Sequence, residues 1–189
     1  MDIIKTTYEL NVAGIKRDLQ LFPINDKLQI GAFILFGDIE LTCKCAEALL
    51  KVAPDHDIMI TAEAKSIPLI HEMARQNGEN SYIIARKGVK VYMRNPLDVC
   101  VNSITTQHQQ HLYLGEDEVN MLKGKRVLLV DDVISTGESL AAMAELVEKA
   151  GGNIVGKMAV LAEGDAIERK DIIVLDKLPL FDAEGNPID

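Results

Sequence analysis

The chain has 189 residues, of which 48% are hydrophobic and 26% charged, and its 20 basic and 29 acidic side chains give a formal net charge of −9. These values predict a single globular domain, residues 1–189, and disfavour a nucleic-acid partner. No apolar run approaches the roughly 18 residues of a membrane span. The three cysteines, Cys43, Cys45 and Cys100, form no disulfide framework, so we expect a cytoplasmic protein.

The N-terminal third predicts strands before the first helix. Two short strands, residues 8–12 and 17–22, are expected within a small flap formed by residues 1–27. A longer apolar strand follows over residues 28–36. Asp38 is a plausible N-cap for a helix that carries apolar residues at helical spacing as far as Leu50, before Pro54.

The rest of the chain alternates strands and helices. We expect strands at residues 58–60, 82–85, 125–130, 154–161 and 172–175, with helices near 67–74 and 140–147. A polar excursion, residues 88–110, interrupts the pattern and predicts a mobile, hairpin-like loop. This alternation predicts an α/β fold with an open, mostly parallel twisted sheet and helices on both faces.

The most informative segment is residues 127–139, where an apolar strand runs into two carboxylates, Asp131 and Asp132. The loop that follows consists of Ser135, Thr136, Gly137, Glu138 and Ser139 and leads into a helix. Backbone N–H groups and hydroxyls at a helix N-terminus form a phosphate cradle. Carboxylates beside it suit ribose hydroxyls or a magnesium-bound group, so the segment predicts a site for a phosphorylated ribose.

Residues 127–139 resemble the 5-phosphoribosyl-1-pyrophosphate (PRPP) signature of the type I phosphoribosyltransferases, and residues 28–181 are similar to their adenine-specific branch. The resemblance implies that Asp131 and Asp132 serve the ribose in catalysis, with Mg²⁺ as cofactor, and that loop 135–139 binds the 5′-phosphate. It also implies a homodimer that acts on PRPP and a purine base.

Two further segments resemble pyrophosphate-binding parts of this family. Residues 60–66 follow a strand and open a helix, and residues 85–87 follow the next strand. The implied pyrophosphate ligands are Glu63, Ala64, Lys65, Arg86, Lys87 and Lys90. The family loop often contains a cis peptide, which points here to Ala64–Lys65. Loop 88–110 would close over the reacting centre, and its residues 101–107 resemble the xanthine-specific enzymes.

The base and the activity leave alternatives open. Residues 162–165 offer no lysine for a purine O6, and Ser135 stands where 6-oxopurine enzymes carry an acid, so adenine is favoured. Lys177 and the xanthine-like segment favour a 6-oxopurine instead. Phe22 and Phe181 are expected to pack in the core rather than stack on the base. A non-catalytic PRPP-sensing regulator is the alternative of another class, although the chain shows no DNA-reading module and is acidic.

Overall fold

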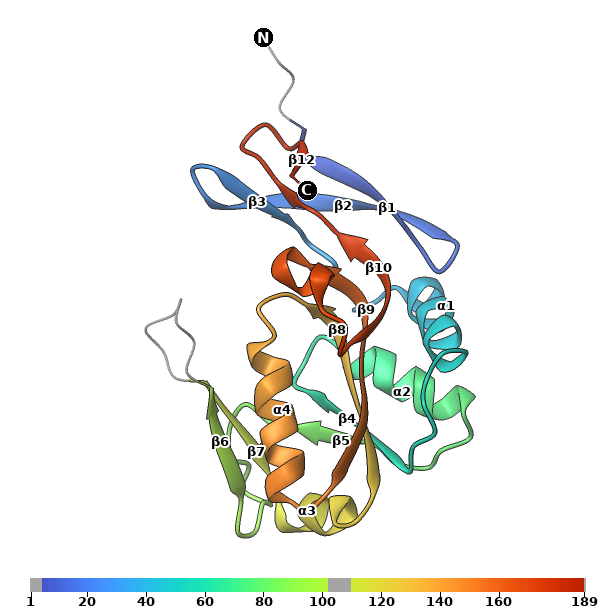
Figure 1. The fold of residues 1–189 in the computed structure, drawn as a ribbon, viewed down its shortest axis with the longest axis vertical. Coiled ribbons are helices and arrows are strands. Elements are labelled where there is room, and N and C mark those ends of the chain that lie inside the picture. The colour runs from blue at the N-terminus through green and yellow to red at the C-terminus, as the bar shows by residue number, and fades with distance from the viewer. Residues whose placement is uncertain (1–4, 102–109, 189) are drawn as a thin grey trace.

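The computed structural model describes residues 5–101 and 110–188, and its upper part in Figure 1 is an antiparallel sheet. The strands, in the order β1-β2-β3-β11-β12, are Thr7–Val12, Ile15–Asn25, Leu28–Gly31, Leu180–Phe181 and Pro187–Ile188. Both ends of the chain therefore contribute to this sheet, which we call the hood sheet. Inside it, Phe181 is fully buried and its ring lies 5.0 Å from that of Tyr8.

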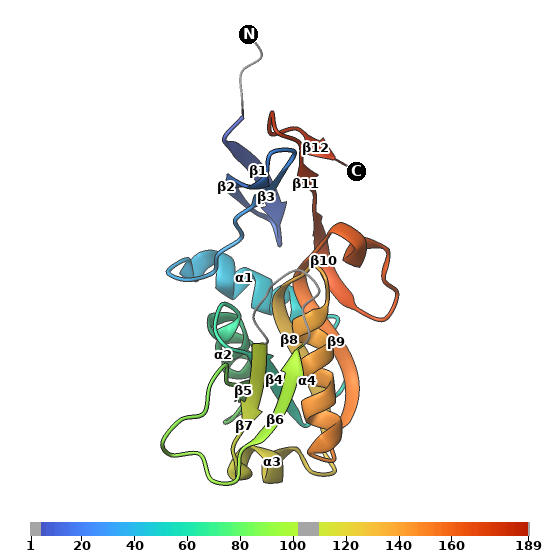
Figure 2. The ribbon, with the colours of Figure 1, turned by 90° about the vertical axis from the view of Figure 1, so that its left-hand side faces the viewer.

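The second sheet is parallel throughout and has the order β10-β9-β8-β4-β5. In that order its strands are Ile173–Leu178, Asn153–Glu163, Arg126–Ile134, Ile58–Ala62 and Ile83–Ala85. The predicted open parallel sheet is confirmed. Parallel strands end at the same edge of a sheet, so the residues that follow β4, β5 and β8 are brought together beneath the hood sheet (Figure 2).

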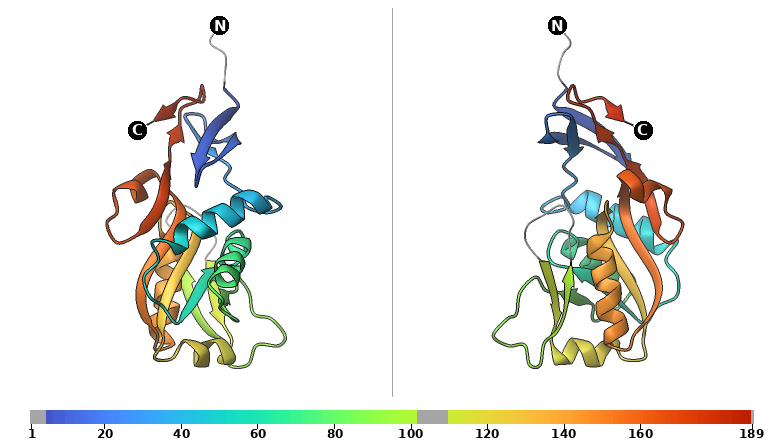
Figure 3. Two further views of the ribbon diagram at one scale, coloured as in Figure 1. Left: turned by 90° about the vertical axis from the view of Figure 1, so that its right-hand side faces the viewer. Right: turned by 60° about the vertical axis from the view of Figure 1, so that its left-hand side comes forward.

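Helices cover both faces of this sheet (Figure 3). On one face α1 (Ile39–Leu50) and α2 (Ile67–Gln76) pack over alternate residues of β8 such as Leu128 and Val130. On the other face α4 (Glu138–Lys149) and the hairpin of β6 (Leu97–Val101) and β7 (Gln110–Leu114) pack over Val127 and Leu129. Two further elements are α3 (Glu116–Leu122) and the 3₁₀ helix η1 (Gly164–Glu168). This two-sided burial explains the uninterrupted apolar runs of the central strands.

Several element predictions need correction. The strand expected over residues 28–36 ends at Gly31, because the chain then leaves the hood sheet to bury Phe33 and Leu35 and to begin α1. Asp38 does cap α1, since its side chain accepts a hydrogen bond from the Leu41 amide. Helix α3 and the C-terminal hood strands were not predicted. Phe22 is 54% exposed, so its predicted place in the core was wrong.

The predicted loop 88–110 is only partly described. Strands β6 and β7 pair antiparallel, in agreement with a hairpin-like excursion. Its tip, and with it most of the xanthine-like segment 101–107, lies outside the described residues. Across the part of the chain that the structure describes, no helix combines the length and the apolar character needed to cross a membrane.

Candidate active site

The two predicted carboxylates lie within β8, because this strand continues past its apolar run to Ile134. Their partner is Ser66, the residue before α2, whose Oγ is 2.6 Å from Asp131 Oδ1 and 3.0 Å from Asp132 Oδ1. The Asp132 amide donates to Ser66 Oγ at 2.9 Å. Ser66 makes no side-chain cap for its own helix. Its hydroxyl instead fixes the carboxylate pair, a role that the sequence did not reveal.

The pKa of the Asp131 carboxyl group is raised well above its ordinary value. Burial disfavours its charged form and the neighbouring Asp132 repels it, and together they raise the pKa of Asp131 to about 7. The hydrogen bond from Ser66 opposes this shift only in part. Asp132 is 2% exposed. Burial and the charge of Asp132 therefore both favour the protonated form of Asp131.

The predicted phosphate loop lies beside Asp131. One cavity of about 120 Å³ is lined by Asp131 and by all five loop residues, Ser135 to Ser139. Gly137 has φ +80°, a left-handed conformation that side chains rarely adopt, and helix α4 starts directly after it. The structure thus brings Asp131 and the loop 135–139 together around one cavity.

The predicted pyrophosphate ligands lie in two clusters, and in each cluster cations pair with one carboxylate. Lys65 Nζ pairs with Asp132 Oδ2 at 3.1 Å. Glu63 pairs with Arg86 at 3.4 Å and with Lys90 at 3.9 Å, and accepts a hydrogen bond from the Lys87 amide at 3.0 Å. The cis peptide joins Glu63 to Ala64, so the predicted position, one bond later, was wrong.

A buried acid, Glu163, joins the site from the end of β9. Only 8% of it is exposed, and burial raises the pKa of its carboxyl group, although a hydrogen bond with the Ser135 side chain and the charge of Lys65 oppose this shift. Reasoning from the sequence noted only that residues 162–165 lack a lysine. A charged residue at the end of an otherwise apolar strand was the signal that could have identified Glu163.

Residues 45–188 match the model of the phosphoribosyl transferase domain. A hypoxanthine/guanine phosphoribosyltransferase of Methanococcus voltae is 31% identical over 145 residues, which cover 77% of this chain and 71% of the relative. An adenine phosphoribosyltransferase of Rhodococcus jostii is 30% identical over 128 residues, or 67% and 69% of the two chains.

Solved structures share the fold. The adenine phosphoribosyltransferase of Thermoanaerobacter pseudethanolicus superposes with a TM-score of 0.70 at 22% identity, covering 84% of this chain and 95% of that one. That of Saccharomyces cerevisiae gives 0.67 at 20% identity, covering 84% and 92%. At these identities the likeness concerns the fold alone.

Proposed function

Because the chain belongs to the phosphoribosyl transferase domain family, we propose that it transfers the phosphoribosyl group of PRPP to a nitrogen of a purine base and releases pyrophosphate. One observation carries the proposal: Asp131 and the loop 135–139 line the same cavity. A phosphorylated ribose needs both a phosphate cradle and acceptors for its hydroxyls. Here the two lie side by side.

Each part of PRPP has a counterpart in the site. Amide groups and hydroxyls of loop 135–139 hold the 5′-phosphate at the start of α4. The ribose hydroxyls donate to Asp131 and Asp132. Apart from its ion pair with Lys65, Asp132 Oδ2 is buried without a hydrogen-bond donor among the described residues, so it can accept one from the ribose. In this proposal Lys65, Arg86 and Lys90 supply the positive charge that the leaving pyrophosphate requires.

Catalysis in this proposal is electrostatic. As the bond to pyrophosphate breaks, positive charge develops at the anomeric carbon of the ribose. Ionised Asp131 and Asp132 stabilise that charge, while the cations stabilise the departing anion. The carboxylates are already oriented by Ser66, so little reorganisation is needed during the reaction.

Magnesium fits this site only together with its substrate. The described residues contain no group of three or more acidic, histidine or cysteine side chains that could hold a metal ion. Asp131 and Asp132 supply at most two of the six oxygen ligands that Mg²⁺ prefers, and PRPP and water would supply the others. When bound, Mg²⁺ neutralises charge on the leaving pyrophosphate.

We place the base in a cavity of about 680 Å³ that is lined by the hood sheet, η1 and β10. Gly164, the residue after Glu163 in the chain, lines this cavity. The cavity is rich in acceptors, including Asp165 and Asp176, which favours the amino group of adenine. Lys177 lines the same cavity and could donate to a purine O6. This residue, with the hypoxanthine/guanine relatives, supports a 6-oxopurine as the second candidate.

A base panel tests the proposal. Adenine, hypoxanthine, guanine and xanthine are each incubated with Mg²⁺ and PRPP, and pyrophosphate release is measured. We expect the highest kcat/KM with adenine, and we expect the Lys177→Met variant to retain it. A higher value for a 6-oxopurine that is lost in Lys177→Met would reverse the choice of base. No release with any base would refute phosphoribosyl transfer itself.

We also propose that the protein forms a homodimer. Ile34, Phe36 and Ile39, before and at the start of α1, are each more than half exposed. Three such side chains within six positions favour contact with a second copy of the chain. Light scattering after size exclusion tests this, and a monomer at micromolar concentration would contradict it.

A further inference from the structure

The phosphate cradle lacks a cation of its own. The only charged side chain within loop 135–139 is that of Glu138, which is negative. The N-terminus of α4 contributes a partial charge of about +0.5. A phosphate monoester carries about −1.5 to −2 near pH 7. The loop alone therefore leaves most of the charge of a bound 5′-phosphate unbalanced.

Arg169, which follows η1, brings a cation to this loop from another part of the chain. Its Nη1 atom lies so close to the position that a Cβ atom on Gly137 would take that no side chain fits there, and the guanidinium thus lies against this residue of the loop. Gly137 is thus required for two reasons, its positive φ and the presence of this side chain. No residue of the phosphate signature predicts the contact, because Arg169 lies 32 positions beyond Gly137.

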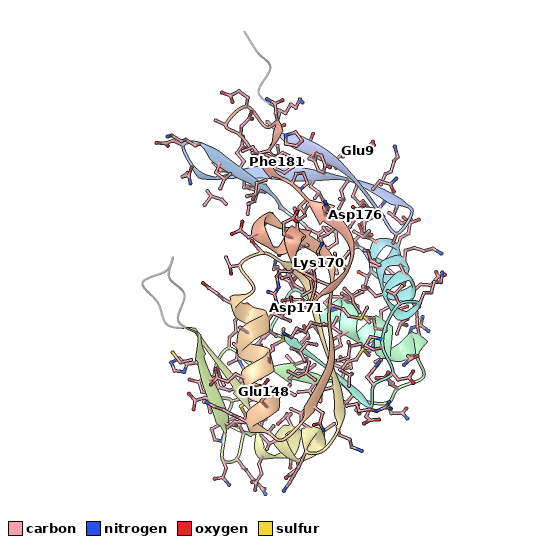
Figure 4. All side chains as sticks on the ribbon, viewed as in Figure 1. Glu9, Glu148, Lys170, Asp171, Asp176 and Phe181 are labelled. Carbon is pink, nitrogen blue, oxygen red and sulfur yellow. The ribbon has the colours of Figure 1, made fainter. Side chains whose placement is uncertain are left out.

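Asp171 fixes the orientation of this guanidinium. It accepts hydrogen bonds from Arg169 Nε at 2.9 Å and from Nη2 at 2.7 Å, so both engage its carboxylate and Nη1 is the nitrogen turned to the loop. Lys157 also contacts Asp171, at 3.2 Å. Figure 4 labels Asp171 between η1 and β10. The Arg169 side chain is 30% exposed, so a ligand can reach it.

We propose that Arg169 binds the 5′-phosphate of PRPP through Nη1 and supplies the charge that loop 135–139 lacks. This inference rests on the proposed function. Asp171 is a positioning residue, because it holds the guanidinium in the orientation that presents Nη1 to the loop. A guanidinium fixed in this way donates to a phosphate with little further loss of side-chain freedom.

The test compares Arg169→Gln with a matched control, Lys157→Gln. Both variants lose one positive charge and the ion pair of that residue with Asp171, but of the two residues only Arg169 touches the loop. Calorimetry measures the binding of ribose 5-phosphate and, separately, of pyrophosphate. We expect Arg169→Gln to weaken ribose 5-phosphate roughly 10- to 150-fold, the effect of losing a charge-assisted hydrogen bond. Pyrophosphate binding should change less than about twofold.

The outcomes separate the two proposals. If wild-type protein binds ribose 5-phosphate and Arg169→Gln binds it equally well, or if Lys157→Gln loses as much affinity, the role of Arg169 is refuted and the proposed function stands. If wild-type protein binds neither ribose 5-phosphate nor PRPP, the proposed function fails as well. Should Arg169→Gln not fold, Arg169→Lys takes its place, and we expect it to bind with intermediate affinity.

Discussion

Replacing Asp131 by Asn should make the protein more stable and less active. Asparagine keeps an oxygen that can accept the hydrogen bonds from Ser66 and from the Asp132 amide. It removes the charge that burial and Asp132 oppose. The same charge is the one that the proposed reaction uses beside the ribose. Stability and activity should therefore change in opposite directions.

The sign and size of the stability effect follow from the raised pKa. Between its ordinary value of 3.8 and about 7, Asp131 binds a proton in the folded chain but not in the unfolded one. Stability therefore falls as pH rises through this window and levels off above it. The cost of the charge is about 2 kcal/mol at pH 5 and about 4 kcal/mol at pH 8. The cost therefore grows by about 2–3 kcal/mol between pH 5 and pH 8. For a chain of this size, that increase corresponds to roughly 5–10 °C in Tm.

Thermal unfolding of Asp131→Asn and wild type from pH 5 to pH 8 measures this effect. Asp57→Asn is the control, because Arg126 lowers the pKa of Asp57 to about 2 and that carboxyl stays ionised over the whole range. Its difference from wild type should not vary with pH. If the Tm advantage of Asp131→Asn fails to grow between pH 5 and pH 8, the raised pKa is wrong. If kcat/KM is unchanged, Asp131 has no part in the reaction.

Three further changes test neighbouring groups. Lys65→Gln should weaken pyrophosphate binding by calorimetry, since it removes a cation beside Asp132, and unchanged binding would exclude Lys65 as a ligand. Glu163→Gln can keep a hydrogen bond to Ser135 but removes an anion near Lys65, so pyrophosphate should bind more tightly, and weaker binding would contradict this. Gly137→Ala should lower the free energy of unfolding by about 1–3 kcal/mol in denaturant titrations, because its φ is positive and Arg169 fills the space; a change within 0.5 kcal/mol, about the error of such values, would refute the close packing.

The sequence predicted the parts of the site that are contiguous in the chain. The two aspartates and loop 135–139 form one strand–loop–helix unit, so their order alone indicated that they meet. Ser66, Glu163 and Arg169 were missed because each reaches that unit from a different element. Ser66, for example, contacts Asp131 from 65 positions away. Such contacts depend on how the elements pack, and hydrophobic periodicity does not report this.

In the fold, too, the sequence predicted the elements that have a local pattern and missed those that depend on long-range contacts. Alternation of apolar strands and helices predicted the parallel sheet, since every central strand is buried on both faces. The hood sheet was predicted only in its first two strands. Its C-terminal strands β11 and β12 have two residues each, and a segment this short has no measurable period. The position of β11 follows from its long-range pairing with β3, and β12 in turn pairs with β11.

The free site already holds its charges in pairs, and this predicts coupling between the two ends of PRPP. In the proposed reaction pyrophosphate draws Lys65 away from Asp132, and this leaves the buried Oδ2 atom of that carboxylate without a partner, at a cost in free energy. A ribose hydroxyl that donates to Asp132 replaces the lost partner. Pyrophosphate should therefore bind more tightly when ribose 5-phosphate is present, by a factor of roughly 5 to 150. Calorimetry with and without saturating ribose 5-phosphate measures this factor, and Lys65→Gln should abolish it. Equal affinities in wild type would show that Lys65 does not link the two subsites.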